Sequence, residues 1–373
     1  MERSLVFVSG YYGFDNLGDE AILEELCSEL KQLVKPEDIV VLSQEPERTA
    51  AKYGVRALKR QSYSEIWNML GRARLLVSGG GGLFQNTKTL GSIIFYGLQI
   101  LMAKSHRAAV VIYAQGIGPL RGAFAPNLCR TFFAQADAIA VRDDASMKYL
   151  QSWGLTGERT ADPVWRLEAS ELPASIKTQL QKVGAAAGGK SRAVGVSLRP
   201  SAELTEEHLR QLAKGLAALL SKDEYLLLLP LQPEQDSALL QSFQNFCNEL
   251  SLKTHMLDTS ELVLPSQWLS VFSELKFLVG MRLHAMIMTL KSGRPVAGIA
   301  YDPKVTQLLA EFEQCCLILT KESAGKDWGD ALKTFASGLN SFSSRAKSRS
   351  EAAKKLACQN FDILARILGM PRD

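Results

Sequence analysis

Three short segments in the second half of the chain combine arginine, histidine and lysine in positions where they could hold an anion. VSLRP carries Arg199, GMRLH carries Arg282 and His284, and YDPK carries Lys304. Arginine can bind a phosphate or a carboxylate through two parallel hydrogen bonds, and lysine adds a compact positive charge. A helix predicted to start near Leu283 would direct the positive end of its dipole at the same anion. These residues therefore predict a pocket for a small, multiply charged anion.

His284 has two interpretations. A histidine at the head of an apolar helix is often a structural group whose ring nitrogens are satisfied by the fold. Its position beside Arg282, with the YDPK segment after the next strand, favours a functional role instead. Because imidazole titrates near neutral pH, His284 is the candidate general acid and base of the pocket. Arg199 and Arg282 would hold the anionic groups, and Lys304 would stabilise a leaving anion.

The first half of the chain carries glycine-rich segments directly after predicted strands. The first of them, GYYGFDNLGDEAIL, covers residues 10–23. Gly13 allows a tight turn and a close approach of the backbone to a ligand. Asp15 or Asp19 could cap the helix that follows. Asp15 and Asn16 are the better candidates for contacting a sugar hydroxyl.

A second segment, SGGGGLFQN, places four consecutive glycines after the third predicted strand, among them Gly81 and Gly82, with Gln85 shortly beyond. Such a run has a large conformational entropy cost and supplies no side chain for packing. We expect its backbone N–H groups to lie exposed at the start of a helix, where they would suit an anion or a sugar. Gln115, in the segment AQGIGPL after the next strand, is a further candidate for hydrogen-bonding a sugar.

The segment VRDDAS follows the fifth predicted strand and has a structural interpretation. Arg142 is expected to form an ion pair with a neighbouring carboxylate. Asp143 or Asp144 would cap the next helix, which should end before Gly154 because glycine is common just past a helix end.

Short apolar strands alternate with helical segments along the chain, which predicts two α/β domains of the doubly wound, Rossmann-like type. Unbroken apolar strands separated by helices are typical of parallel sheets covered on both faces. Ligands of such sheets bind beyond the carboxyl ends of the strands, where the segments above occur. The two domains would face a cleft, as in the GT-B class of glycosyltransferases. The predicted strands cover residues 5–9, 39–43, 75–78, 109–114, 138–141, 194–198, 225–229, 277–279 and 295–299.

The glycine-rich segment KVGAAAGGKSRA predicts where the two domains meet. We expect an N-terminal domain over residues 1–181, a linker over 182–193, a C-terminal domain over 194–340 and a basic C-terminal helix over 341–373. That last helix would pack on the body with a solvated basic face, or else contact anionic lipid. The apolar helix over residues 92–103 also has two interpretations, a buried helix or a shallow contact with a membrane.

Composition and charge exclude several functional classes. With 43 basic and 39 acidic residues the net charge is +4, too small to indicate nucleic-acid binding but compatible with an anionic substrate or membrane surface. The six scattered cysteines and four histidines predict reduced thiols and no metal site. Apolar runs are too short for a signal peptide or a bilayer span, so we expect a cytoplasmic protein, either free or peripheral on the inner face of the plasma membrane.

The segments resemble, in type and in order along nearly the whole chain, those of the polysaccharide pyruvyl transferase family. They are GYYGFDNLGDEAIL, SGGGGLFQN, AQGIGP, VRDDAS, DPV, MRLHAMI and YDPK. The likeness is strongest to the bacterial cell-surface-anchoring type, which attaches a pyruvate ketal to N-acetylmannosamine in a secondary cell-wall polymer. S-layer homology domains of surface proteins then bind that polymer.

The resemblance implies a substrate pair and a set of site residues. The donor co-substrate would be phosphoenolpyruvate, with no cofactor, and the acceptor a lipid-diphosphate-linked disaccharide containing N-acetylmannosamine. The donor-binding residues would be Arg199, Arg282, His284, Lys304 and, through its backbone, Leu283. The acceptor side would include Gly13, Asn16, Gly81, Gly82, Gln85 and Gln115, with Asp15 as the base for an acceptor hydroxyl.

The main alternative on the same scaffold is a glycosyltransferase with a nucleotide-sugar donor. A shared fold does not separate the two chemistries. The Arg/His/Lys cluster suits a small trianion better than a nucleotide, and the second half shows no clear pair of ribose-binding carboxylates. A non-catalytic carbohydrate- or lipid-binding protein is the third possibility, but it would not require converging cations.

Overall fold

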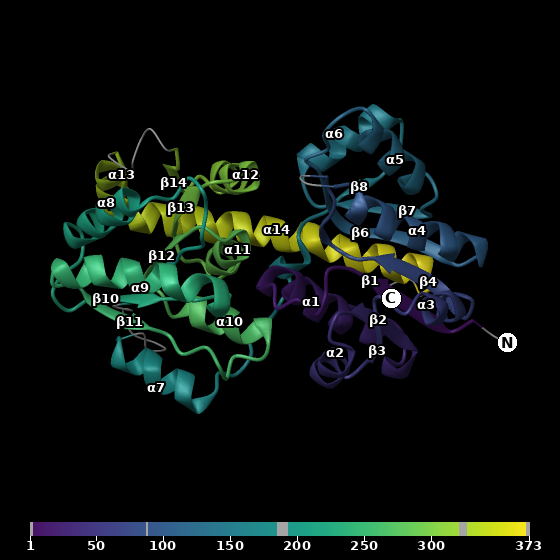
Figure 1. Ribbon diagram of the computed structural model, residues 1–373, viewed down its shortest axis with the longest axis horizontal. Coiled ribbons are helices and arrows are strands. Elements are labelled where there is room, and N and C mark those ends of the chain that lie inside the picture. The colour runs from purple at the N-terminus through teal and green to yellow at the C-terminus, as the bar shows by residue number, and fades with distance from the viewer. Residues whose placement is uncertain (1–2, 87–88, 185–192, 321–326, 371–373) are drawn as a thin grey trace. The chain divides into compact units, whose positions relative to one another are not determined.

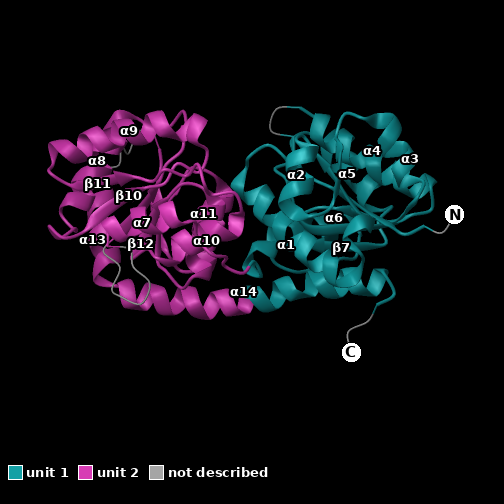
Figure 2. Ribbon diagram, turned by 90° about the horizontal axis from the view of Figure 1, so that it is seen from below, with its two compact units in different colours: residues 1–167, 353–373 teal, residues 168–352 magenta. Residues whose placement is uncertain are grey.

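The structure is a computed structural model that describes residues 3–86, 89–184, 193–320 and 327–370, and it separates into two compact units (Figure 2). Unit 1 comprises residues 1–167 and 353–373, and unit 2 comprises residues 168–352. Each unit is built on a parallel β-sheet with helices on its faces. The predicted fold class, two Rossmann-like α/β domains, is therefore confirmed.

The sheet of unit 1 has the strand order β3-β2-β1-β4-β6-β7-β8, with β5 paired to β6 (Figure 1). Its strands are β1 (Leu5–Ser9), β2 (Ile39–Ser43), β3 (Arg56–Lys59), β4 (Ala73–Ser78), β5 (Gly81–Phe84), β6 (Ala109–Ile117), β7 (Ala138–Val141) and β8 (Glu158–Arg159). The helices are α1 (Leu17–Leu33), α2 (Pro46–Tyr53), α3 (Tyr63–Leu70), α4 (Gly91–Ser105), α5 (Phe124–Phe133) and α6 (Asp144–Trp153), with short 3-10 turns η1 (Pro36–Asp38) and η2 (Pro163–Trp165).

The sheet of unit 2 has the strand order β11-β10-β9-β12-β13-β14. Its strands are β9 (Ala193–Ser197), β10 (Tyr225–Leu228), β11 (Lys253–Met256), β12 (Phe277–Gly280), β13 (Val296–Ala300) and β14 (Cys315–Ile318). The helices are α7 (Ala174–Lys182), α8 (Glu206–Ala217), α9 (Pro233–Glu249), α10 (Pro265–Ser273), α11 (Leu283–Lys291), α12 (Pro303–Glu311) and α13 (Trp328–Ser337). The long helix α14 (Leu339–Ile367) follows.

Each sheet has one point where the direction of strand order reverses. In unit 1 this switch lies between β1 and β4, and in unit 2 it lies between β9 and β12. The chain leaves two adjacent strands toward opposite faces at such a point, which opens a crevice beyond their carboxyl ends. The glycine segments of the first half and the arginine segments of the second half follow these strands.

All nine predicted strands are present, with ends displaced by at most three residues. Among the described residues, five further strands are present that were not predicted. Four of them, β3, β8, β11 and β14, are the outermost strands of the two sheets, where one face or edge meets solvent. Their residues are mostly exposed or half-buried, whereas every residue of β1, β2 and β9 is buried. The apolar runs that mark central strands are missing from β3, β8 and β11, whereas β14 is apolar but only four residues long.

The two units divide the chain at Leu167, ahead of the glycine-rich segment that we expected as the linker. Helix α7, which precedes that segment, belongs to unit 2, and residues 185–192 of the expected linker lie outside the described residues.

Helix α14 contributes to both units. Ser350 donates a hydrogen bond to the Leu290 carbonyl in unit 2, and Asn360 donates one to the Ala161 carbonyl in unit 1. Its C-terminal part is packed, with Leu364 fully buried.

The helix predicted over residues 92–103 is α4, and only one side of it is buried. Tyr96 and Ile100 face the core of unit 1. Ile94, Leu98 and Leu101 are 42%, 50% and 39% exposed on the opposite side. In the described part of the chain, no helix has the length and apolar character needed to cross a bilayer.

Candidate functional site

Arg199 and Arg282 lie at the same rim of the sheet in unit 2. Gly280 of β12 pairs with Ser197 of β9 on one side and with Gly298 of β13 on the other, so the three strands end nearly level. Arg199 follows Ser197 by two residues, and Arg282 follows Gly280 by two residues. They flank the switch point of this sheet, where a ligand of a doubly wound domain binds.

Two helices begin at this rim. Helix α11 starts at Leu283, as the sequence predicted, so that Arg282 holds the cap position and His284 lies in the first turn. His284 is partly buried, and its Nε2 atom has almost no contact with solvent. Asp302 caps α12, because its carboxylate accepts a hydrogen bond of 2.8 Å from the backbone N–H of Lys304. The positive ends of both helix dipoles therefore lie at the rim that carries the basic side chains.

Arg282 is held by Asp236, a residue that the sequence analysis missed. The Nε and Nη2 atoms of Arg282 donate hydrogen bonds of 3.1 and 2.6 Å to the two carboxylate oxygens of Asp236. Asp236 has no exposed surface and also accepts a hydrogen bond of 2.9 Å from the backbone N–H of Gln232. This bidentate pair fixes the guanidinium and balances its charge, while Nη1 stays outside the pair. The sequence offered one signal for Asp236. It is an aspartate in the first turn of α9, the helix that follows β10, and β10 is the strand next to β9.

Arg199 contacts Tyr301, the tyrosine of the YDPK segment. Its Nη1 atom donates a hydrogen bond of 3.2 Å to Tyr301 Oη, and the guanidinium carbon lies 5.1 Å from the centre of the ring. No carboxylate in the described ranges forms an ion pair with Arg199. This contact orients the arginine without a carboxylate beside it, which leaves its positive charge available to a ligand.

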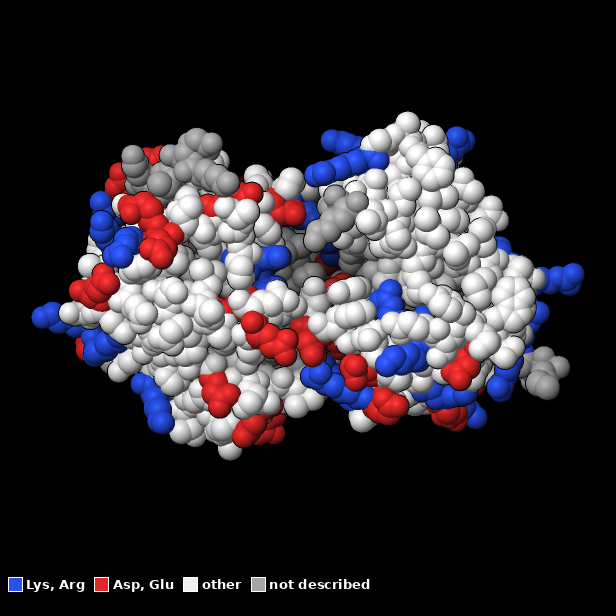
Figure 3. All heavy atoms as spheres, in the orientation of Figure 1, with Lys and Arg blue, Asp and Glu red and all other residues white. Residues whose placement is uncertain are grey.

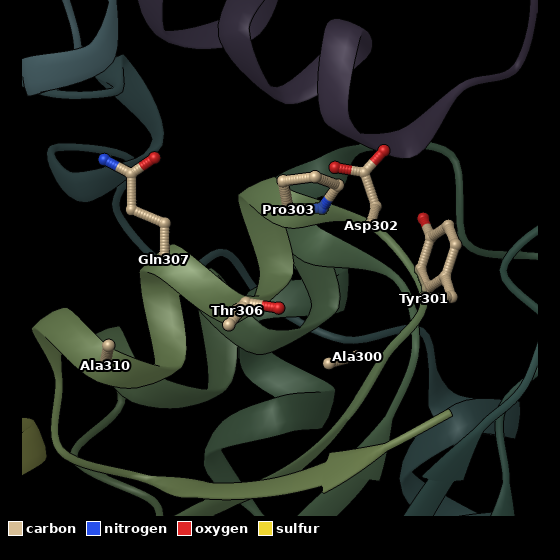
Figure 4. A pocket seen from close by; sticks show the side chains of 7 residues that line it. All are labelled: Ala300, Tyr301, Asp302, Pro303, Thr306, Gln307 and Ala310. Atoms are coloured by element: carbon tan, nitrogen blue, oxygen red, sulfur yellow. The ribbon is translucent and has the colours of Figure 1, made fainter. Parts of the chain in front are cut away.

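A surface hollow borders this rim at the start of α12 (Figure 4). The side chains of Tyr301, Asp302 and Gln307 project from the same side of the loop and the first turns of the helix. The hollow is lined by Ala300, Tyr301, Asp302, Pro303, Thr306, Gln307 and Ala310. Tyr301 therefore belongs both to the arginine contact and to the wall of the hollow.

In unit 1, the residue that caps α1 is Asn16, rather than Asp15 or Asp19 as expected. The Asn16 side-chain oxygen accepts a hydrogen bond of 3.1 Å from the backbone N–H of Gly18. Asp15 adopts a positive φ of 54° and forms an exposed ion pair of 2.7 Å with Arg48. The first turn of α1 is thus stabilised by an amide cap, with Asp15 at the surface in front of it.

Gly13 holds the turn between β1 and α1 through contacts that only glycine permits. Its φ is 77°, and a Cβ atom there would lie 2.3 Å from Ser43 Oγ. Its backbone N–H donates a hydrogen bond of 2.8 Å to Glu20, a buried carboxylate that also accepts one of 2.8 Å from Tyr53 Oη. The turn is consequently anchored from inside the unit, and glycine is required there for conformation and space.

The four consecutive glycines do not begin a helix. Gly81 and Gly82 are the first residues of β5, which pairs with β6, and α4 begins only at Gly91. Close packing explains the glycines: a Cβ atom on Gly79 would lie 2.1 Å from the Tyr12 hydroxyl oxygen, and one on Gly81 would lie 2.8 Å from an Asp19 oxygen. The expectation of a helix start was wrong because strand pairing with β6 satisfies this backbone.

Gln115 and Gln85 lie beside this glycine strand. The Gln115 amide nitrogen donates hydrogen bonds of 2.7 and 3.0 Å to the carbonyl oxygens of Gly81 and Gly116, and the residue is fully buried. Gln115 therefore ties β6 to β5. Gln85 is half-buried, and its carbonyl oxygen accepts a hydrogen bond of 2.9 Å from the Ser92 hydroxyl at the start of α4.

The structural interpretation of VRDDAS is confirmed. Arg142 forms an ion pair of 2.5 Å with the buried Asp162. Asp143 caps α6 by accepting a hydrogen bond from the backbone N–H of Ser146, and the helix ends in front of Gly154, whose φ is 68°.

Among the described residues, no group of three or more His, Cys, Asp or Glu side chains is arranged to hold a metal ion.

Comparison with known proteins gives one family. Residues 16–303 match the polysaccharide pyruvyl transferase family. A search of curated proteins finds no match.

Solved structures share the two-domain fold at low sequence identity. Anabaena HepE, crystallised with UDP and glucose, has a TM-score of 0.61 and 11% identity, over 98% of this chain and 99% of that chain. A putative UDP-N-acetylglucosamine 2-epimerase from Listeria monocytogenes has a TM-score of 0.64 and 11% identity, over 99% and 98%. A glycosyltransferase from Rickettsia africae has a TM-score of 0.60 and 11% identity, over 98% and 99%. At this identity the likeness concerns the fold and not the chemistry.

Proposed function

The chain belongs to the polysaccharide pyruvyl transferase family, and from that membership we propose that it moves pyruvate from phosphoenolpyruvate to a cell-wall polysaccharide precursor. The acceptor in this proposal is an N-acetylmannosamine residue of a lipid-diphosphate-linked disaccharide, as in the cell-surface-anchoring type. The pyruvate would bridge the 4- and 6-hydroxyls of that sugar as a ketal, and phosphate would leave. The finished polymer would then be a ligand for S-layer homology domains.

One observation carries the donor assignment: Arg199, the Arg282–His284 segment and Lys304 follow three neighbouring strands that end nearly level. Phosphoenolpyruvate carries a carboxylate and a phosphate, so several cations must offset the loss of its hydration. Arg199 supplies an uncompensated guanidinium, and Lys304 adds a second positive charge. The backbone at Leu283, at the start of α11, offers N–H groups to the same anion.

Arg282 has a different part in this proposal from that of Arg199. Its charge is balanced by Asp236, so its main contribution is a rigid, oriented donor at Nη1. A fixed guanidinium loses little side-chain entropy when the anion binds. Arg282 would therefore orient one oxygen of the donor, whereas Arg199 and Lys304 would supply most of the attraction.

Ketal formation needs a proton at the methylene carbon of the donor. In the proposed sequence His284 delivers that proton, the methylene becomes a methyl group, and C2 becomes electrophilic. One acceptor hydroxyl adds to C2 and loses its proton to a base. The second hydroxyl then adds to C2 as the C2–O bond to phosphate breaks, and its proton leaves with the phosphate or returns to His284. No metal or cofactor takes part in this scheme.

The acceptor would bind at the switch point of unit 1, beyond β1 and β4. Asp15 is the proposed base for an acceptor hydroxyl, because its carboxylate lies at the surface in front of α1 with Arg48 beside it. The backbone of Gly13 and of Gly81 and Gly82 would allow the sugar to approach closely. Asn16, Gln85 and Gln115 would support the shape of this surface through the hydrogen bonds described above.

A lipid-linked acceptor would require contact with a membrane, and we propose that unit 1 makes it as a cytoplasmic, peripheral protein. The supporting surface consists of the exposed side chains Ile94, Leu98 and Leu101 of α4 and Phe124 of α5, two helices that pack together. The sequence from Ile66 to Ala136 contains seven lysines and arginines and no acidic residue. In Figure 3 the part of unit 1 that carries α4 and α5 is largely uncharged, with basic residues at its margins. An apolar face with a basic border suits an anionic bilayer.

The test of the proposal is a reaction with defined substrates. Phosphoenolpyruvate is supplied with a small panel of lipid-linked disaccharides, and released phosphate and product mass are measured together. The proposal expects phosphate release only with an N-acetylmannosamine-containing acceptor, at one phosphate per ketal. The alternative, a nucleotide-sugar glycosyltransferase, expects release of a nucleotide and no consumption of phosphoenolpyruvate.

A further inference from the structure

Arg60, directly after β3 in unit 1, lies among four aromatic rings. Its guanidinium carbon is 4.4 Å from the ring centre of Phe95, 5.1 Å from that of Phe14, and 5.9 Å from those of Tyr11 and Tyr96. The rings of Tyr11 and Phe14 are themselves stacked, 4.1 Å apart and 5° from parallel. We call these four rings and Arg60 the arginine cage. The rings come from the β1–α1 turn and from α4, so distant parts of the sequence converge on one cation.

The charge of Arg60 is not compensated by an acid. In the described part of the chain Arg60 forms no ion pair, and its Nη1 atom is buried without a hydrogen-bond partner. Aromatic faces stabilise a guanidinium, but they leave its N–H groups free to donate in the plane. A guanidinium in this state can bind a phosphate through two parallel hydrogen bonds.

Buried hydroxyl groups without partners lie beside the arginine cage. Tyr12 is 1% exposed, and its hydroxyl has no hydrogen-bond partner among the described residues. Tyr96 is 3% exposed, and its hydroxyl lies close enough to Arg60 for the two groups to interact. Ser9 and Ser78, the last residues of β1 and β4, pair in register and carry two more hydroxyls that, like that of Tyr12, have no partner among the described residues. An unsatisfied buried polar group is costly, so a cluster of three, Tyr12, Ser9 and Ser78, indicates a place that a polar ligand occupies.

The contacts of Tyr12 and Tyr96 join these hydroxyls to the arginine cage. Tyr12 lies against Gly79, where a Cβ atom would meet its hydroxyl oxygen at 2.1 Å. Burial raises the pKa of Tyr12, and the charges of Asp19 and Tyr96 act in the same direction. Burial also raises the pKa of Tyr96 to about 12, although the positive charge of Arg60 and a hydrogen bond with it oppose this rise. Both phenols therefore remain protonated at neutral pH and can donate hydrogen bonds.

We propose that the arginine cage and these hydroxyls bind the phosphate next to a sugar, with the phosphate on Arg60 and the sugar against the stacked rings of Tyr11 and Phe14. Tyr12 and Tyr96 donate hydrogen bonds to oxygens of the same ligand. This inference rests on the proposed function, in which the acceptor sugar carries a diphosphate. It places the phosphate of the acceptor at the switch point of unit 1. The phosphate contacts side chains there, and not the backbone of the glycine-rich segments.

The first experiment isolates the phosphate contact. Binding of N-acetylglucosamine 1-phosphate and of N-acetylglucosamine is measured by calorimetry for the wild type, for Arg60→Gln and for Arg130→Gln, an exposed arginine on α5 that serves as a matched control. The phosphate should strengthen binding at least ~10-fold in the wild type and in R130Q, and less than ~3-fold in R60Q. An equal gain from phosphate in all three proteins would overturn the proposal, and so would the absence of a gain in the wild type.

Two further measurements distinguish loss of the phosphate contact from misfolding and from damage to the donor site. R60Q should bind phosphoenolpyruvate as the wild type does, because the donor residues lie in unit 2. Arg60→Lys keeps the charge but not the planar fork, and it should recover only part of the phosphate gain. If R60Q lost donor binding together with sugar phosphate binding, the effect would be general damage and the assignment of Arg60 would fail.

The last arm identifies the natural ligand. With a short-chain polyprenyl-diphosphate disaccharide as acceptor, R60Q should raise KM by at least ~10-fold with a smaller change in kcat. If KM is unchanged while the sugar phosphate still depends on Arg60, the site serves a free sugar phosphate and its link to the acceptor is refuted. If the wild type shows no pyruvyl transfer but keeps the Arg60-dependent gain, the proposed function fails and the phosphate site remains.

Discussion

Arg282 donates two hydrogen bonds to Asp236, a carboxylate with no exposed surface that stands 46 residues earlier in the chain. The pair joins the first turn of α9 to the cap of α11, on either side of the carboxyl end of β9. His284 follows Arg282 by two residues, so the pair also fixes the backbone that carries the proposed acid and base. Removal of either partner would leave the charge of the other unpaired, in a site with little access to water.

The first prediction concerns this pair. Asp236→Ala should lower the free energy of unfolding by about 3–5 kcal/mol, because it leaves the Arg282 guanidinium half-buried without its partner. The double variant D236A/R282A should lose less than the sum of the two single variants. Urea unfolding measures all three. Glu249→Ala, which breaks the exposed Arg210–Glu249 pair of 3.3 Å, is the control and should cost less than about 1 kcal/mol. Strictly additive losses at Asp236 and Arg282 would refute the coupling.

The second prediction separates chemistry from donor binding. His284→Gln should reduce kcat by at least ~100-fold, since the proton for the methylene carbon has lost its source. Donor affinity, measured by calorimetry, should change less than ~3-fold, because the arginines remain. Arg199→Ala is the complementary variant and should weaken donor binding strongly. Wild-type phosphate release by H284Q would remove His284 from the mechanism.

The third prediction concerns the orientation of Arg199. Tyr301→Phe removes the hydroxyl that accepts its hydrogen bond but keeps the ring beneath the guanidinium. Loss of one such bond is worth about 0.5–1.5 kcal/mol, which corresponds to a rise of about 2- to 13-fold in KM for phosphoenolpyruvate. Steady-state kinetics checks this value. An effect as large as that of Arg199→Ala would mean that Tyr301 contacts the substrate directly.

The fourth prediction tests the apolar face of unit 1. Leu98→Glu on α4 should abolish sedimentation with vesicles of phosphatidylglycerol and phosphatidylcholine, because it places a negative charge in the centre of that face. Leu250→Glu is the matched control, as Leu250 is 40% exposed in unit 2 and Leu98 is 50% exposed. Binding to anionic vesicles should weaken with added salt. Equal retention of L98E and L250E on vesicles would disprove the membrane contact, and a dimer of the wild type that L98E alone disrupts would assign the face to self-association.

The fifth prediction uses two glycines with opposite surroundings. Gly79→Ala should destabilise unit 1 and displace Tyr12, since the new Cβ would meet the Tyr12 hydroxyl oxygen at 2.1 Å. Gly329→Ala should be neutral or mildly stabilising, because nothing lies within 4 Å of its Cβ position and the residue is in helix α13. Thermal unfolding of both variants gives the comparison. A melting temperature for G79A at or above that of the wild type would contradict the packing described for the glycine run.

The sequence was sufficient to predict the parts of the fold that carry a strong local signal. Buried strands such as Leu5–Ser9 and Ile39–Ser43 are continuous apolar runs, and their boundaries agree with the structure. The start of α11 at Leu283 was also predicted, because the strand and the helix on either side of Gly280–Arg282 have clear patterns. The edge strands β3, β8 and β11 lack such a signal, since each has only one strand neighbour and retains charged or polar residues.

Contacts between distant residues account for what the sequence analysis missed. Nothing near Arg282 in the chain indicates Asp236, and nothing near Arg60 indicates the rings of Phe14 and Phe95. The close packing of the glycines was missed because their partners, Tyr12 and Asp19, come from another segment. The sequence analysis also missed that Asn16 caps α1, although an asparagine in front of a helix is suited to capping it.

The central claim, transfer of pyruvate from phosphoenolpyruvate, is tested most directly by following both products of a single reaction. The purified protein is incubated with phosphoenolpyruvate and a lipid-linked disaccharide containing N-acetylmannosamine, and phosphorus NMR and product mass are recorded over time. We predict that inorganic phosphate appears at the same rate as a pyruvate ketal on that sugar, without any nucleotide present. Intact phosphoenolpyruvate together with sugar transfer from a nucleotide donor would contradict the account.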